Sequence, residues 1–169
     1  MIFKLLSFLL LLLTLNGCDM VWFNETFRNP YTVDIGKNTN LKSGKWHTFE
    51  KNLKAINRTQ VVKVKFENGE WSRHSMVNLG ENECGWPKIG LQPDSPTDPV
   101  IIDLLAVDSE GNEVPLCLSG LTYYELIFST PFSVRSELTG KTFTKIKIRS
   151  NTELQHVELK WLSRTGGLL

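Results

Sequence analysis

Carboxylates are the first candidates for chemistry in this chain. Asp103, Asp108 and Glu110 lie within one short segment, and a pair of carboxylates can act as general acid and base in glycoside hydrolysis. Asp108 and Glu110, however, belong to the run Asp108-Ser-Glu-Gly-Asn112, which is typical of a turn, where such side chains bond to nearby backbone. No Ser-His-Asp spacing, nucleophile elbow or glycine-rich phosphate loop accompanies them. We therefore expect a protein that is not an enzyme.

Aromatic side chains are the stronger candidates for binding. Trp86 lies two residues after Cys84, in a segment rich in glycine and proline. On a fixed loop, its indole could stack on a sugar or anchor a partner protein. The alternative is that Trp86 folds back and covers the edge of the domain. The candidates for ligand or partner contact are Trp86, Trp46, Arg73 and His74.

The first 17 residues have the organisation of an export signal. Lys4 precedes the uncharged run Leu5 to Leu15, as in the charged and apolar regions of secretory signals. This run is shorter than the roughly 20 residues that a membrane-spanning helix needs. We therefore expect residues 1–17 to direct export and to be absent from the folded domain.

The run ends in Leu15-Asn16-Gly17-Cys18, which resembles the lipobox of bacterial lipoproteins. The resemblance covers only the first 18 residues, and Asn16 departs from the smaller or more apolar residue usual at its position. It implies cleavage before Cys18 and acylation of Cys18, with palmitate among the acyl chains, and such chains would anchor the protein stably. Asp19 resembles the signal that retains lipoproteins of enteric bacteria in the inner membrane. The alternative is an ordinary signal peptide, cleaved after Gly17, that leaves Cys18 as a free thiol.

The remaining two cysteines are expected to form a disulfide. Lipidation of Cys18 leaves Cys84 and Cys117, and two cysteines in an oxidising compartment most simply pair. The alternative is two buried thiols. A metal site is not expected, because these cysteines and the three histidines show no ligand spacing. The sequence suggests no cofactor.

The charge balance argues against a nucleic-acid partner. The chain has 19 basic and 18 acidic residues, and Lys4 lies in the signal, so 18 of each remain. A neutral domain lacks the positive charge that binds phosphate backbones. It also shows no basic patch for anionic lipid, so the lipid on Cys18 is the expected membrane contact.

Hydrophobic alternation with a period of two predicts β-strands over most of the chain. In one segment Val62, Val64 and Phe66 alternate with charged residues, and Trp71, after the turn signal Asn68-Gly69, would share their buried face. Other expected strands cover 27–35, 100–107, 113–118, 121–128 and 132–135. Residues 78–99 are expected to be irregular. Thr48 to Asn57 is the one helix candidate, because Phe49, Leu53 and Ile56 have helical spacing.

The last expected element is a hairpin over residues 144–162. Ile146 and Ile148 would face inward with Val157, Leu159 and Trp161, while the alternating charges would form a solvated face. This hairpin resembles the end of galactose-binding-like jelly rolls, although the resemblance covers some 20 residues and includes no diagnostic motif.

Together these patterns predict an all-β protein, an antiparallel β-sandwich of jelly-roll or immunoglobulin-like type with at most one short helix. We expect a signal peptide (1–17), a lipid-anchored tether (18–30) and a β-sandwich domain (31–169) facing the periplasm. Its expected function is to bind a protein partner of the cell envelope, as an assembly component or as an inhibitor or immunity-type protein. The alternative is a carbohydrate-binding jelly-roll module.

Overall fold

The computed structural model describes residues 31–67, 76–82, 84, 87–91, 99–122 and 125–164. Ten strands and one short helical segment lie within these residues. The strands are β1 (Tyr31–Leu41), β2 (His47–Lys54), β3 (Thr59–Lys65), β4 (Met76–Glu81), β5 (Pro87–Leu91), β6 (Ile102–Asp108), β7 (Glu113–Leu121), β8 (Leu126–Ser129), β9 (Thr142–Ser150) and β10 (Leu154–Arg164). The helical segment joins the 3₁₀ turn η2 (Phe132–Val134) to α2 (Arg135–Leu138). The all-β class is confirmed.

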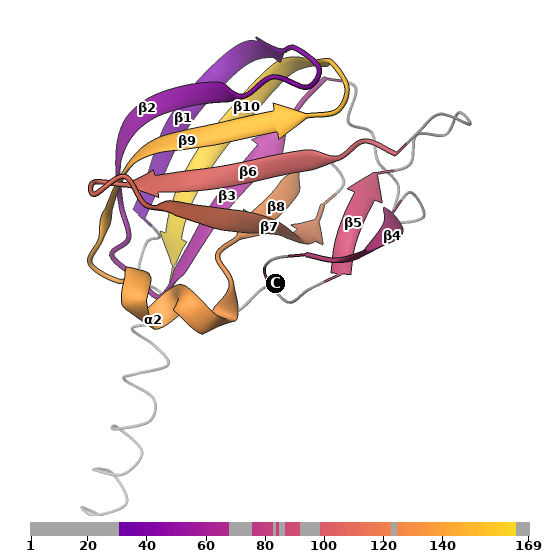
Figure 1. Cartoon of the computed structure of the whole chain (residues 1–169). Coiled ribbons are helices and arrows are strands. Elements are labelled where there is room, and N and C mark those ends of the chain that lie inside the picture. Colours follow the sequence, from indigo (N-terminus) through magenta and orange to yellow (C-terminus); the bar gives the residue numbers. More distant parts are fainter. Residues whose placement is uncertain are drawn as a thin grey trace, which may run out of the picture.

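Eight strands form one strongly curved antiparallel sheet in the order β1-β10-β3-β8-β7-β6-β9-β2. The pairing is nested: β1 pairs with β10, β2 with β9, β3 with β8, and β6 with β7. Such nesting is the jelly-roll arrangement, in which a long folded ribbon of strands winds into two facing layers. The topology therefore favours the jelly-roll alternative over the immunoglobulin-like one. Figure 1 shows the two layers, with α2 across one end.

The two ends of the strand order approach each other and nearly close the sandwich into a barrel. The Tyr31 hydroxyl donates a hydrogen bond of 3.4 Å to the carbonyl oxygen of Asn52. Gly36 lies against the ring of Phe49, where an added Cβ would be 2.5 Å from a ring carbon. Both contacts join β1 to β2, the terminal strands of the order.

One apolar core fills the space between the layers. Val62, Val64, Phe66, Ile146 and Ile148 are buried in it, as their alternation predicts. At the centre the rings of Phe143 and Trp161 have centroids 5.3 Å apart. The indole nitrogen of Trp161 donates to the carbonyl oxygen of Lys54, so its polar atom is satisfied.

The expected hairpin over 144–162 is not formed. Its inward residues are correct, but β9 pairs with β2 and β6, whereas β10 pairs with β1 and β3. The two strands thus belong to opposite layers, and their apolar faces meet across the core. Alternation identifies the buried face of a strand, but it does not identify the neighbouring strand.

Four further local predictions are wrong in whole or in part. Thr48 to Asn57 forms most of β2 and a turn, because pairing with β9 overrides the helical spacing, and Ile56 is exposed in the turn. Phe132 to Arg135 is helical after Pro131, whose fixed φ suits a helix start. Residues 78–99 are not wholly irregular, since they contain β5 and most of β4. The expected strand 121–128 is not one element, because β7 ends at Leu121 and β8 begins at Leu126.

The strands β4 and β5 form a separate two-stranded sheet inserted between β3 and β6. Figure 1 shows this insertion beside the sandwich. Its position matters because it forms one wall of the groove described next.

Candidate functional site

The described part of the chain contains a groove of about 530 Å³. Its floor is the outer face of β6, β7 and β9, and its side wall includes Glu81, Asn82 and Lys88 from the insertion. Since Leu104, Leu116 and Ile148 are buried in the core, their strand neighbours must point outward into the groove. A volume of this size suits a small ligand or a few residues of an extended peptide.

An aromatic and ionic triad forms one end of the groove. Asp103 and Arg149 are opposite each other on β6 and β9, and the guanidinium donates to Asp103 Oδ2 at 2.7 and 3.1 Å. The same guanidinium lies over the ring of Trp46, 4.7 Å from its centroid. Trp46 remains 41% exposed. The triad therefore presents an accessible indole whose cationic neighbour is held in place.

The floor of the groove combines apolar side chains with a second ion pair. Leu105 pairs across the sheet with Pro115 on one side and with Lys147 on the other, and both Leu105 and Pro115 are half-buried. Lys147 Nζ lies 2.6 Å from Glu113 Oε1. The acids of both ion pairs therefore each contact a cation.

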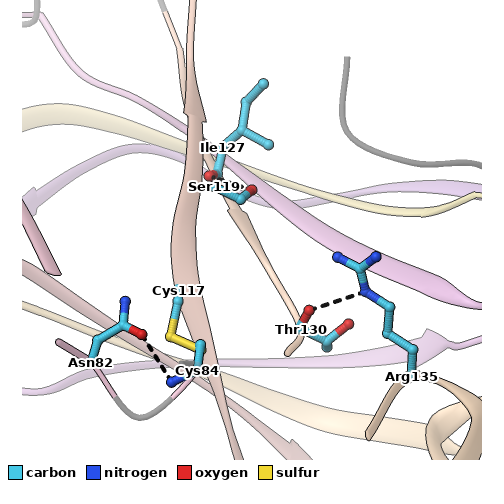
Figure 2. The surroundings of a disulfide bond; sticks show 7 residues. All are labelled: Asn82, Cys84, Cys117, Ser119, Ile127, Thr130 and Arg135. Carbon is cyan, nitrogen blue, oxygen red and sulfur yellow. Dashed lines mark hydrogen bonds between the residues drawn. A yellow bond between two sulfur atoms is a disulfide. The ribbon is translucent and has the colours of Figure 1, made fainter. Parts of the chain in front are cut away.

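The Cys84–Cys117 disulfide is confirmed, with 33 residues of sequence separation and a Cα–Cα distance of 6.2 Å. It links the segment between β4 and β5 to β7, and Cys117 itself lines the groove. Asn82 stabilises this segment by accepting a hydrogen bond from the backbone N–H of Cys84 (Figure 2). The disulfide thus attaches the wall of the groove to its floor.

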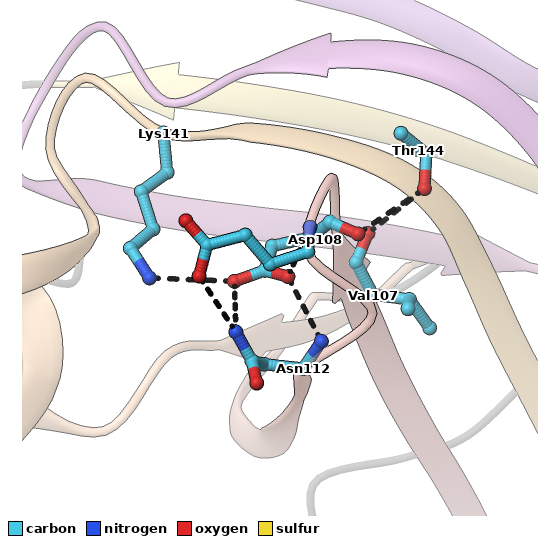
Figure 3. Close-up of polar contacts among 6 residues, drawn as sticks. Val107, Asp108, Asn112, Lys141 and Thr144 are labelled. Carbon is cyan, nitrogen blue, oxygen red and sulfur yellow. Dashed lines mark hydrogen bonds and ion pairs between the residues drawn. The ribbon is translucent and has the colours of Figure 1, made fainter.

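Asp108 has the structural role that its turn predicts. Its carboxylate accepts hydrogen bonds from the Asn112 side chain and from the backbone N–H groups of Asn112 and Glu110, and it forms an ion pair with Lys141 (Figure 3). These interactions, foremost the Asn112 side-chain hydrogen bond, lower the pKa of Asp108 to about 2. The group stabilises the β6–β7 turn and lies outside the groove lining.

The structure places only some of the residues predicted from the sequence. Trp46 lies in the groove, whereas Cys18, Arg73, His74 and Trp86 fall outside the described residues. Sequence reasoning missed Arg149, because the charges of β9 have the pattern of an ordinary solvated face, and it missed Leu105. It named Asp103 only as a candidate for carboxylate chemistry, which is not the role that the ion pair with Arg149 indicates. The residues of the triad come from three separate segments, so no local sequence signal unites them.

The described residues contain no cluster of three or more His, Cys, Asp or Glu side chains placed to hold a metal ion. Within the same part of the chain, no helix has the length and apolarity required to cross a membrane. No protein-family model matches the sequence, and comparison with curated proteins finds no match either.

Proposed function

We propose that this protein is a lipid-anchored, non-enzymatic binding protein of the bacterial envelope, which holds a segment of a partner protein in the groove. The anchor is supported by the sequence alone, through the export signal and the lipobox ending at Cys18. The partner is an assembly component of the envelope or a protein that this lipoprotein inhibits. If sorting follows the enteric pattern, Asp19 keeps the protein in the inner membrane, facing the periplasm.

The composition of the groove is the observation that carries the binding function. Apolar contact is offered by Leu105, Pro115 and the exposed indole of Trp46. Polar groups surround these side chains and belong to the ion pairs Asp103–Arg149 and Glu113–Lys147. An apolar centre with a polar rim is the usual anatomy of a protein interface. Because Arg149 and Lys147 are already paired with acids, and the lining charges Glu81 and Lys88 have opposite signs, the groove favours a partner segment with apolar side chains over a strongly charged one.

The binding function can be tested by site-specific photocrosslinking in native membranes. A photoreactive phenylalanine analogue replaces Leu105, and the matched control carries it at Lys65, which is exposed on β3 outside the groove lining. We expect a discrete protein adduct from position 105 and none from position 65. Trp46→Ala in the Leu105 variant is expected to reduce the adduct several-fold. Equal labelling from both positions would contradict the groove as the binding site.

A carbohydrate is the second candidate, because Trp46 is accessible and Arg149, held by Asp103, could donate hydrogen bonds beside a stacked sugar ring. The adduct at position 105 separates the candidates. Partner peptides in the mass spectrum of the digested adduct indicate a protein partner, and a loss of mass on glycosidase treatment without partner peptides indicates a glycan. The anchor is tested separately by labelled palmitate, whose incorporation we expect Cys18→Ala to abolish.

A further inference from the structure

One end of the sandwich combines an exposed aliphatic side chain with exposed cations. Ile56 is 50% exposed in the turn after β2. Lys54 and Arg58 flank it in sequence and are exposed, as is Lys51 on β2. None of these three cations forms an ion pair with a described residue. We call Lys51, Lys54, Ile56 and Arg58 the Ile56 surface.

The Ile56 surface lies where the described chain begins. Tyr31, the first described residue, pairs with Ser163, and the Ser163 hydroxyl accepts a hydrogen bond of 2.9 Å from the backbone N–H of Asn57. The turn that contains Ile56 is therefore bonded to β10 at the residue that pairs with the first residue of β1. The backbone at Ala55 also bonds to Gly140 and Lys141, so the turn lies beside the segment that follows α2 (Figure 1).

The groove lies toward the other end of β2. Trp46 precedes the first residue of β2 and Ile56 follows its last, so about ten strand-like steps of 3.3 Å at most separate them. This is roughly 25–30 Å if the strand is slightly bent. If the domain contacts a larger body through the Ile56 surface, Trp46 lies at the other end of β2, away from that body.

We propose that the Ile56 surface rests on an anionic membrane, orienting the domain so that the groove faces the aqueous compartment. This inference rests on the proposed lipid anchor at Cys18. Tyr31 is 13 positions after Cys18, a distance of at most about 45 Å along an extended chain, so the tether reaches the bilayer without fixing the orientation of the domain. The Ile56 surface supplies the orientation, because its cations attract anionic headgroups and Ile56 enters the interface.

The charge distribution at this end supports a bilayer rather than an acidic protein as the occupant. Near this end Asp108 is paired with Lys141 and Glu50 with Lys145, whereas the exposed cations Lys51, Lys54 and Arg58 outnumber Glu137, the exposed acid of α2. Diffuse positive charge around a single exposed aliphatic side chain lacks the apolar core of a protein interface. It does have the composition of a shallow interfacial contact.

The test uses the full lipidated chain in vesicles of phosphatidylethanolamine and phosphatidylglycerol. An environment-sensitive fluorophore is attached at Ile56→Cys, with Lys45→Cys, in the turn that precedes β2, as the matched control. Acylation of Cys18 and the Cys84–Cys117 disulfide leave the introduced thiol as the labelling position. We expect a blue shift and quenching by nitroxide lipids at position 56 and neither at position 45. Adding Lys54→Ser and Arg58→Ser is expected to weaken the contact by about fivefold for each charge removed.

Vesicle flotation separates failure of the orientation from failure of the anchor. If the protein floats with vesicles but both positions are quenched equally, or neither is, the orientation is refuted and the anchor stands. If the protein does not float, the anchor and the orientation are both refuted. A blue shift at position 56 in native membranes without quenching by nitroxide lipids would assign the Ile56 surface to a protein partner and overturn the membrane contact.

Discussion

The contact between Gly36 and Phe49 yields the sharpest test of the fold. A Cβ added to Gly36 would lie 2.5 and 2.8 Å from two carbons of the Phe49 ring, which is closer than van der Waals contact allows. Gly36 is not among the residues with positive φ, so Gly36→Ala introduces a steric effect without backbone strain. Overpacking costs about 1–3 kcal/mol, and the lower entropy of the unfolded alanine chain offsets about 0.4–1 kcal/mol of it. We expect a net destabilisation of about 1–2 kcal/mol.

A double-mutant cycle isolates the cause. In a Phe49→Ala background the ring is absent, so Gly36→Ala is expected to be neutral or slightly stabilising, with a coupling energy of about 1–3 kcal/mol. Gly120→Ala is the matched control, because its Cβ would meet Ile127 at an ordinary 3.5 Å. Equilibrium urea unfolding gives each free energy of unfolding. Additive effects of the two substitutions, or equal effects at Gly36 and Gly120, would refute the contact that closes β1 onto β2.

Asp108→Asn is expected to make the free energy of unfolding depend less on pH in the acid range. The folded-state pKa of about 2 lies below the ordinary value of 3.8, so the stability that Asp108 contributes is complete above pH 3.8 and is lost as the pH falls toward 2; a melting temperature that falls as steeply for the variant as for the wild type would contradict this. Replacing both Cys84 and Cys117 by alanine opens a loop of 33 residues and is expected to lower the free energy of unfolding by about 3–4 kcal/mol, whereas coincident urea curves with and without reductant would argue against the disulfide. Asn57→Ala removes the side-chain donor to the buried Ser163 carbonyl, at an expected cost of about 1–3 kcal/mol, and an unchanged unfolding midpoint would exclude that contribution.

The hairpin error shows what alternation can and cannot predict. Ile146, Ile148, Val157 and Leu159 are all buried, as the period of two requires. Their strands nevertheless lie in opposite layers, because β9 and β10 pair with strands far away in the chain. The alternation of polar and apolar residues in one strand is compatible with many neighbouring strands. Only the complete set of strand pairings determines which neighbour the strand has.

The groove could not be predicted for the same reason. Trp46 was identifiable as an aromatic candidate, but its function in the groove depends on Arg149 and Asp103, which come from β9 and β6. The disulfide was predictable, because the export expected from the sequence leaves a pair of cysteines with one simple outcome in an oxidising compartment. The sequence did not predict that this disulfide attaches the β4–β5 insertion to the floor of a groove.

The sequence by itself determined the all-β class, the buried face of most strands and the cysteine pair, because period-two alternation and a count of cysteines are properties of the chain alone. Only the tertiary structure decided the nested strand pairing, the assembly of Trp46, Arg149 and Asp103, and the position of Ile56 among exposed cations. The net charge of the chain did not predict the exposed cations around Ile56, because a chain with balanced charges can still have several cations at one end of its fold. Long-range backbone pairing decides which distant side chains become neighbours, and local composition does not encode it.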